Sequence, residues 1–421
     1  MKKALQTEHI FRHEYGPLVA SLVGRVGTQH LNSVEDAVQH AMMQALNFWS
    51  RDKLPDHPAA WLYQVAYRQL LSEFRIAKRR NNLLAEHALI ANDELTEAIE
   101  IPLPGEMSDA LLRMLFVTCH EELPLESQLV FTLKSLCGFS VKEIALRIFL
   151  SEANVYKRFN RAKQFLKKHP SALNTLNETQ ITIRLPMVHR ILYLLFTEGY
   201  FSSHAAMAIR QDLCEEALRL SLLLSDSKLG SSPTGYALMA LMHFHMARMN
   251  ARQDDSGALL LLEQQDRSLW DQACIKKGMG YLQKSAQGDA ISRYHIEASI
   301  AAEHCLAPSF KETNWEKIVT SYQLLEHIAP SILHRLNHAI AISQWQDSEA
   351  GLAVLESIDI PPWLARSYYW HAVQADLQHG CGKLALAYEN AQLAIAAAPN
   401  KDIKHLLHKR LAKCILSHEQ N

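Results

Sequence analysis

The sequence predicts an all-α protein, and three observations support that fold class. The 421 residues include only 15 Gly and 14 Pro, too few for the turn-rich connections of an all-β chain. Hydrophobic residues make up 48% of the chain, and they recur at helical spacing in one segment after another. Serine-led capping signals stand where several of these segments begin. The length allows roughly two to four domains.

Residues 1–80 predict a helical domain. Ser33-Val-Glu-Asp36 is a capping-box sequence, so we expect a helix to begin there. Its apolar stripe would be Val34, Val38, Ala41, Met42, Ala45 and Phe48. A polar loop at residues 50–57 then leads through Pro58 into a second helix.

This second helix mixes aromatic and cationic side chains. The rings are Trp61, Tyr63, Tyr67 and Phe74, and the cations are Arg68, Arg75, Lys78, Arg79 and Arg80. Rings among cations suit single-stranded DNA, because bases stack on the rings while the cations hold the backbone. The alternative is that the rings, above all Trp61 and Phe74, belong to the hydrophobic core. The pattern alone leaves both interpretations open.

Residues 81–108 predict an acidic linker between two basic modules. From Asn81 to Leu112 the chain contains Asp and Glu but no Lys or Arg, whereas residues 157–168 form a second basic stripe. The net charge of −1, from 43 cationic and 44 acidic residues, is therefore an average over unlike parts. Two linked basic modules can contact separated patches of one polyanion.

Residues 109–170 predict a helix-turn-helix domain. A helix at residues 125–137 ends at Gly138, and Ser140-Val-Lys-Glu143 forms a capping box for the next helix. After a short turn, Ser151 is the N-cap of a last helix that ends at His169-Pro170.

The last of these helices is amphipathic in a way that suits DNA. At 100° per residue, Val155, Phe159, Ala162 and Leu166 share one face. We expect the opposite side and the N-terminal turn to meet DNA through Ser151, Asn154, Lys157, Arg158, Asn160, Arg161, Gln164 and Lys168. The pattern alone also permits an ordinary helical hairpin.

These motifs resemble region 4 of the extracytoplasmic-function (ECF) sigma factors. The segments that carry the resemblance are Leu123-Pro-Leu-Glu-Ser-Gln-Leu-Val-Phe131, Gly138-Phe-Ser-Val-Lys-Glu-Ile-Ala145 and Asn154-Val-Tyr-Lys-Arg-Phe-Asn-Arg-Ala162. The resemblance implies that this domain reads the −35 promoter element. The family usually has Thr where this chain has Asn154.

The first domain resembles sigma region 2. Val34-Glu-Asp-Ala-Val-Gln-His-Ala-Met-Met-Gln-Ala-Leu46 is similar to the helix that docks on the polymerase clamp, which implies clamp contacts by Asp36, Gln39 and His40. Resemblance to regions 2.3 and 2.4 implies that the loop from Asp52 to His57 receives a flipped −10 base. The −10 site would comprise Asp52, His57, Trp61, Tyr67, Arg68, Arg75, Lys78, Arg79 and Arg80. The implied partners are core RNA polymerase, through its β′ clamp and β flap, and promoter DNA.

Residues 181–421 predict a domain of helical hairpins. Helical stripes follow one another at about 17 to 20 residues from Tyr294 through Trp315, Leu333, Trp363 and Leu384 to Leu406. Gly382, Ala387, Ala394 and Pro399 stand where tetratricopeptide repeats have small residues and a closing proline. The segments 194–200, 263–270, 294–302 and 336–341 resemble the C-terminal extension of one ECF group, often called ECF42. The resemblance then covers nearly the whole chain.

Catalytic and metal chemistry find little support. His243-x-His245 and His334-x3-His338 have ligand spacing, but no third ligand, Gly-rich loop or nucleophile motif accompanies them. Seven scattered cysteines form no CxxC pair, so neither a disulfide framework nor a zinc ribbon is indicated. We expect no enzyme activity, no cofactor and no metal, and we interpret Glu198, Asp266 and Arg267 as ion pairs that fix helix packing.

The sequence therefore predicts a sigma factor that directs promoter-specific initiation, with a regulatory or scaffolding C-terminal domain that can contact the other domains or further proteins. No stretch approaches the roughly 18 apolar residues of a membrane span and Met1 to Ile10 has no signal-peptide pattern, so we expect a cytoplasmic protein without membrane attachment. Two other functions remain open. One is a stand-alone helix-turn-helix regulator, and the other is a tetratricopeptide adaptor with vestigial DNA modules.

Overall fold

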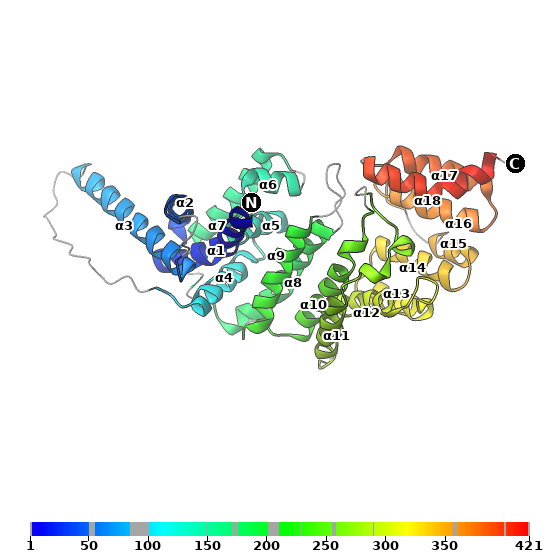
Figure 1. Ribbon diagram of the computed structural model, residues 1–421, viewed down its shortest axis with the longest axis horizontal. Helices are drawn as coiled ribbons and strands as arrows, with labels where there is room; N and C mark the ends of the chain where they lie inside the picture. The colour runs from blue at the N-terminus through cyan, green and yellow to red at the C-terminus, as the bar shows by residue number, and fades with distance from the viewer. Residues whose placement is uncertain are drawn as a thin grey trace. The chain divides into compact units, whose positions relative to one another are not determined.

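In the computed structural model, the regular elements of the described residues are helices joined by turns and loops, apart from one isolated antiparallel bridge between Gln253 and Leu259 (Figure 1). The described residues are 2–49, 55–84, 101–148, 150–170, 173, 176–200, 210–228, 230–254, 258–288, 290–356, 360–399 and 401–419. The chain divides into two compact units, Met1–Leu194 and Leu195–Asn421, and the boundary falls within helix α8. The predicted all-α fold class is confirmed. None of the described helices is both long enough and apolar enough to cross a membrane.

Unit 1 is organised around its first helix. The described elements are α1 (Lys2–Val26), η1 (Thr28–His30), α2 (Leu31–Phe48), α3 (Pro58–Leu84), α4 (Pro104–Thr118), α5 (Leu125–Phe131), the π-turn η2 (Thr132–Leu136), α6 (Val141–Arg147), α7 (Glu152–Lys168) and most of α8 (Glu178–Tyr200). Leu18, Val19, Leu22 and Val23 of α1 are fully buried. Helix α1 packs against α2, α3, α4 and η2, so it holds the early and late helices of the unit together.

The predicted start of α2, at the Ser33 capping sequence, is wrong. Helix α2 begins at Leu31, two residues before Ser33, and the short helix η1 leads directly into it from Gly27, which has φ +97°. Ser33 therefore lies inside the helix and does not cap it. The apolar stripe is right for Val34, Val38, Ala41 and Ala45, which are all buried, but Phe48 at the end of α2 is 71% exposed.

The local signals of the helix-turn-helix are confirmed. Gly138 has φ +73°, as expected for the residue that ends a helix in the left-handed region. At the start of α6, the Glu143 amide donates to Ser140 Oγ over 3.2 Å and the Ser140 amide donates to Glu143 Oε2 over 2.8 Å. At the start of α7, the Asn154 amide donates to Ser151 Oγ over 3.2 Å.

Unit 2 is a succession of antiparallel helices. Its described elements are α9 (Gln211–Asp226), α10 (Pro233–Ala247), η3 (Met249–Ala251), η4 (Leu262–Gln264), η5 (Arg267–Leu269), α11 (Gln272–Ser285), α12 (Arg293–Leu306), α13 (Trp315–Ile328), α14 (Ile332–Trp345), α15 (Ser348–Glu356), α16 (Tyr368–Gly380), α17 (Leu384–Ala396) and α18 (Lys401–Glu419). Consecutive helices pack on each other, and separate hydrophobic clusters follow along the chain from α12 to α18. Such nearest-neighbour packing is what a hairpin array requires.

The helix expected around Trp363 in unit 2 is not present. Trp363 lies in the turn before α16 and is 58% exposed. Pro361 and Pro362 precede it, and a proline disfavours helical backbone at the residue before it. The helix of this interval is α15, and Gly382 with φ +71° forms the turn between α16 and α17.

Candidate nucleic-acid and polymerase interface

Helix α7 separates its apolar and polar residues as predicted. Val155, Phe159, Ala162 and Leu166 are at most 2% exposed, and Phe165 is buried beside them. Helices α5 and α6 pack on this face, and the rings of Phe131 and Phe159 lie 5.9 Å apart. The capped N-terminus and the buried face fix the orientation of α7 within the helix-turn-helix.

The opposite side of α7 carries the predicted −35 residues. All of them are exposed except Arg158, which is half-buried: Ser151, Asn154, Lys157, Arg158, Asn160, Arg161, Gln164 and Lys168. Lys157, Arg158, Arg161 and Lys168 make no ion pair with any described residue. This surface therefore presents unneutralised cations beside amide side chains, which is the chemistry that phosphates and base edges require.

Helix α3 carries a second polar surface. At helical spacing, Trp61, Arg68, Arg75 and Arg79 lie along one stripe of the helix. The three arginines are exposed, as are Lys78 and His57. Asp52 lies outside the described residues, and the side chain of Arg80 is not among those described.

The aromatic rings of this domain are mostly packed together. Trp61 is half-buried, and its ring meets Trp49 edge-on with centroids 5.6 Å apart. Tyr67 is half-buried and stacks on buried Tyr63 at 6.1 Å, and the Arg25 guanidinium lies 4.6 Å from the Tyr67 ring centroid. Burial raises the pKa of Tyr63. The rings thus contribute to packing, and the exposed cations are the groups most available to DNA.

Two of the three predicted clamp residues, Asp36 and Gln39, line a groove beside α2. Asp36 and Gln39 are exposed and His40 is half-buried, with Gln44 Nε2 3.5 Å from His40 Nε2. Asp36 and Gln39 face a groove of about 760 Å³, whose opposite side includes Lys142 and Lys163 of α6 and α7. Both domains of unit 1 therefore contribute to this groove.

Comparison with known proteins agrees with this geometry. Residues 11–80 match the family model for sigma-70 region 2, and residues 113–166 match the model for sigma-70 region 4. An uncharacterized protein of Rhizobium meliloti is 34% identical over 373 residues, which cover 88% of each chain. The ECF RNA polymerase sigma factor SigL of Mycobacterium tuberculosis is 26% identical over 137 residues, covering 32% of this chain and 72% of SigL.

The chain contains the region 2 and region 4 domains of sigma-70 factors, and it belongs to one family with the Rhizobium meliloti protein. Its region 2 and region 4 domains are those of a non-enzymatic factor that binds core RNA polymerase and promoter DNA. Residues 184–286 match a family of unknown function, DUF6596. No solved structure matches the chain.

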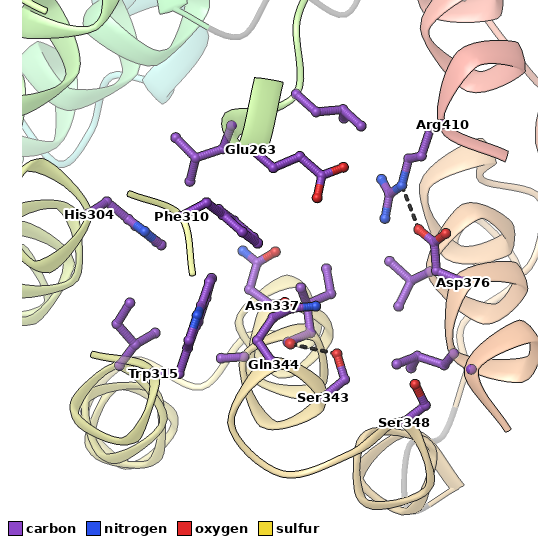
Figure 2. Close-up of a pocket in the computed structure, with 18 of the residues that line it drawn as sticks. Glu263, His304, Phe310, Trp315, Asn337, Ser343, Gln344, Ser348, Asp376 and Arg410 are labelled. Atoms are coloured by element: carbon purple, nitrogen blue, oxygen red, sulfur yellow. Dashed lines mark hydrogen bonds and ion pairs between the residues drawn. The ribbon is translucent and has the colours of Figure 1, made fainter. Parts of the chain in front are cut away.

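The extension of this chain contains a pocket of about 460 Å³ (Figure 2). One wall is aromatic, since the Trp315 ring lies 5.1 Å from Phe310 and 5.4 Å from His304. The other wall is polar and includes Asn337, whose Oδ1 accepts a hydrogen bond from the Tyr369 hydroxyl. Further polar groups of the pocket are Glu263, Gln344, Asp376, Arg410 and Lys413.

Paired charges stand at the polar end of the pocket. Arg410 Nε donates to Asp376 Oδ2 over 2.7 Å, and Lys413 Nζ lies 3.4 Å from Asp376 Oδ1. Burial lowers the pKa of His304 to about 3, with Arg248 and Arg267 adding to the effect. The pocket thus combines a neutral aromatic end with a charged end.

The Asp266–Arg267 segment acts differently from the predicted ion pair. Arg267 Nη1 donates to the carbonyls of His304 and Ala307 at the end of α12, over 2.5 and 2.8 Å. Asp266 instead caps η5 by accepting from the Ser268 amide over 2.9 Å. Arg267 anchors η5 to the end of α12, and its partners are too distant in sequence for a local pattern to reveal.

The paired histidines are held by packing and by carboxylates. His243 is 4% exposed and stacks on Tyr281 at 5.4 Å, and burial lowers its pKa to about 4. His338 Nδ1 lies 2.8 Å from Glu326, and His334 Nε2 lies 3.6 Å from Glu297. Across the described part of the chain, no group of three His, Cys, Asp or Glu side chains could hold a metal ion.

Proposed function

We propose that this chain is an ECF-type sigma factor that directs initiation at promoters with defined −35 and −10 elements. In this proposal α7 reads the −35 element, α3 with its preceding loop opens the −10 element, and Asp36, Gln39 and His40 contact the β′ clamp. Region 4 also contacts the β flap. The single observation that carries the proposal is the exposed face of α7, with unpaired Lys157, Arg158 and Arg161 on a capped helix.

Binding energy would drive separation of the DNA strands at the −10 element. Exposed Arg68, Arg75 and Arg79 on α3 would hold the displaced backbone of the −10 strand, because cationic grooves follow single strands through their phosphates. The accessible part of the half-buried Trp61 ring would stack on an unpaired base. Unstacking a base costs a few kcal/mol, which contacts by region 4 and by polymerase would offset.

Promoter-dependent transcription in vitro tests the proposal. Purified core polymerase and the full chain are mixed with a genomic template library. The transcripts should begin downstream of two shared sequence elements, each at a fixed distance from the start site. Core polymerase alone should yield none of them. If the chain adds no promoter-dependent start site at any concentration, the proposal is wrong.

A region 2 variant separates recognition from opening. Replacing Arg68, Arg75 and Arg79 with alanine should leave duplex −35 binding by holoenzyme intact. It should reduce permanganate reactivity of −10 thymines, because the single strand is no longer held. Equal loss of duplex binding would contradict the assignment of α3.

The alternative function, a stand-alone helix-turn-helix regulator, predicts a different footprint for the free protein. A helix-turn-helix regulator protects its duplex site in a footprint without polymerase. The sigma proposal predicts protection only when core polymerase is present. Strong polymerase-independent protection would favour the regulator.

The C-terminal domain is proposed as a regulatory or scaffolding element of the kind found in the ECF42 group, with a tetratricopeptide-like hairpin array. The support is its hairpin packing and its pocket with an aromatic and a charged end. A chain that ends after Tyr200 keeps α8, whose Val188, Ile191 and Leu192 are buried. Its promoter-dependent output should differ from that of the full chain, and equal output in vitro and in cells would exclude a regulatory role.

A further inference from the structure

The walls of the pocket in unit 2 are tied to one another by side-chain bonds. Asn337 of α14 accepts from the Tyr369 hydroxyl of α16, and Arg410 of α18 donates to Asp376 of α16 over 2.7 Å. These two bonds link three of the helices that line the pocket. Its volume of about 460 Å³ lies in the range of small-molecule sites, which bind best when their walls are already in place. The pocket is therefore large enough for one small molecule and needs little rearrangement to accept it.

Two opposite charges enter this pocket from different elements. Glu263 comes from η4 and Arg410 from α18 (Figure 2), and the Glu263 side chain makes no ion pair or hydrogen bond with any described residue. Asp376 pairs with both Arg410 and Lys413, so it offsets one of two cations and leaves a net charge of +1 on that side. The pocket thus offers an uncompensated carboxylate on one side and an uncompensated cation on the other.

The remaining wall is aromatic and uncharged. Trp315 is half-buried, so part of its indole ring stays accessible, and Phe310 and His304 hold it edge-on at 5.1 and 5.4 Å. Burial lowers the pKa of His304 to about 3, so this ring is neutral at pH 7. Aromatic rings pair favourably with one another in offset-stacked or edge-to-face arrangements. This wall therefore favours a flat apolar group over a charged one.

We propose that the pocket binds a small zwitterion with an aromatic side group, which is the chemistry of a free aromatic α-amino acid. The ammonium group of the ligand lies at Glu263, its carboxylate lies at Arg410 and Lys413, and its ring lies against Trp315. Such a ligand gives both charged sides a partner at once, whereas a singly charged molecule leaves one side without a partner. The proposal does not depend on the proposed sigma function, because every group that recognises the ligand belongs to unit 2.

Titration calorimetry with the full chain tests the proposal in the absence of polymerase. The probes are L-tryptophan, L-tyrosine and L-phenylalanine, and at least one should bind at one site per chain with a dissociation constant below about 1 mM. L-Leucine, which has no ring, should bind more weakly than that probe. If none of the three aromatic amino acids binds saturably, the proposal is wrong.

Ligand analogues test the two charged sides on the wild-type protein, so that the folding of a variant does not affect the result. The amide of the best probe lacks the carboxylate, and its N-acetyl derivative lacks the ammonium group. Each should bind about tenfold more weakly than the free amino acid, because each leaves one charged side without its partner. An N-acetyl derivative that binds as well as the free amino acid would overturn the zwitterion and would instead indicate the carboxyl-terminal residue of a peptide.

Two variants assign the ligand charges to side chains. Glu263→Gln should weaken the free amino acid about tenfold and leave the affinity for the N-acetyl derivative unchanged, because that derivative has no ammonium group. Lys413→Met should weaken the free amino acid severalfold and leave the affinity for the amide unchanged. Both residues are exposed, so the variants should keep the fold. A variant that weakens the free amino acid and its paired derivative equally would overturn that assignment.

Matched controls remove the same charges outside the pocket. Glu316 of α13 and Lys409 of α18 are exposed and do not line it, so Glu316→Gln and Lys409→Met should bind every probe as the wild type does. Weakening by the controls equal to that by Glu263→Gln and Lys413→Met would contradict the site. Specific binding by a chain that directs no promoter-dependent transcription would refute the sigma function and leave the pocket assignment in place.

Discussion

The salt dependence of promoter binding gives the sharpest quantitative prediction for α7. The perturbation replaces Lys157, Arg158 and Arg161 with alanine, which removes three cations that make no ion pair with any described residue. Because each cation is free to meet a phosphate, each contributes about 0.9 to the slope of log affinity against log salt concentration. Removal of all three should therefore lower that slope by about 2.7.

The slope difference has a large effect across an accessible range. Between 50 and 200 mM salt, the affinity of the wild-type holoenzyme for a promoter fragment should fall about 40-fold more than that of the triple variant. Fluorescence anisotropy with holoenzyme at several salt concentrations measures both slopes. The Ser151 cap and the buried face of α7 remain intact, so the helix itself should be unaffected.

A matched variant controls for net charge. Lys276, Lys277 and Lys311 are exposed lysines of the C-terminal domain, and their replacement by alanine removes the same charge from another surface. This control should keep the wild-type slope. If both triple variants change the slope equally, or if the α7 variant does not change it, α7 is not the phosphate-contacting surface.

The remaining predictions concern stability. Ser140→Ala should destabilise region 4 by about 1 kcal/mol, since the capping box of α6 is lost, and a thermal midpoint unchanged from wild type would contradict this. Burial lowers the pKa of His189 and of His243 to about 4, whereas an unfolded histidine titrates near ~6.5. The unfolded chain therefore binds more protons than the folded chain between these pH values, so the urea midpoint should fall as the pH drops from 6.5 to 4. The fall should be smaller in His243→Gln. A urea midpoint that does not change with pH would be inconsistent with neutral buried rings. Arg267→Ala should remove two carbonyl contacts and destabilise unit 2 by roughly 2 kcal/mol, with faster amide exchange at the end of α12, whereas Arg267→Lys should lose less; equal exchange in all three proteins would show that the contacts are not stabilising.

Local signals account for what the sequence predicted well. Gly138, the Ser140–Glu143 box and Ser151 each act within a few residues, so the helices of region 4 and the outward face of α7 follow from the sequence alone. The predicted start of α2 is wrong because Ser33 has a capping sequence but lies two residues inside a helix that follows η1 without a break.

Contacts between distant residues could not be predicted in this way. Glu35 is an acidic residue in a polar helix segment, and its burial depends on Lys134 and Ser135, which are 99 and 100 residues away. Arg267 reaches carbonyls 37 and 40 residues away, so proximity to Asp266 suggested the wrong partner. Periodicity identifies a face, but it does not identify what covers that face.

In the proposed function, this chain gives core polymerase its promoter specificity. The most direct measurement is a footprint of holoenzyme on a promoter recovered from the template library, combined with permanganate probing. The sigma account predicts protection at the −35 element and reactive thymines at the −10 element with holoenzyme, and neither with core polymerase or the chain alone. Protection by the chain alone, or no open region with holoenzyme, would contradict it.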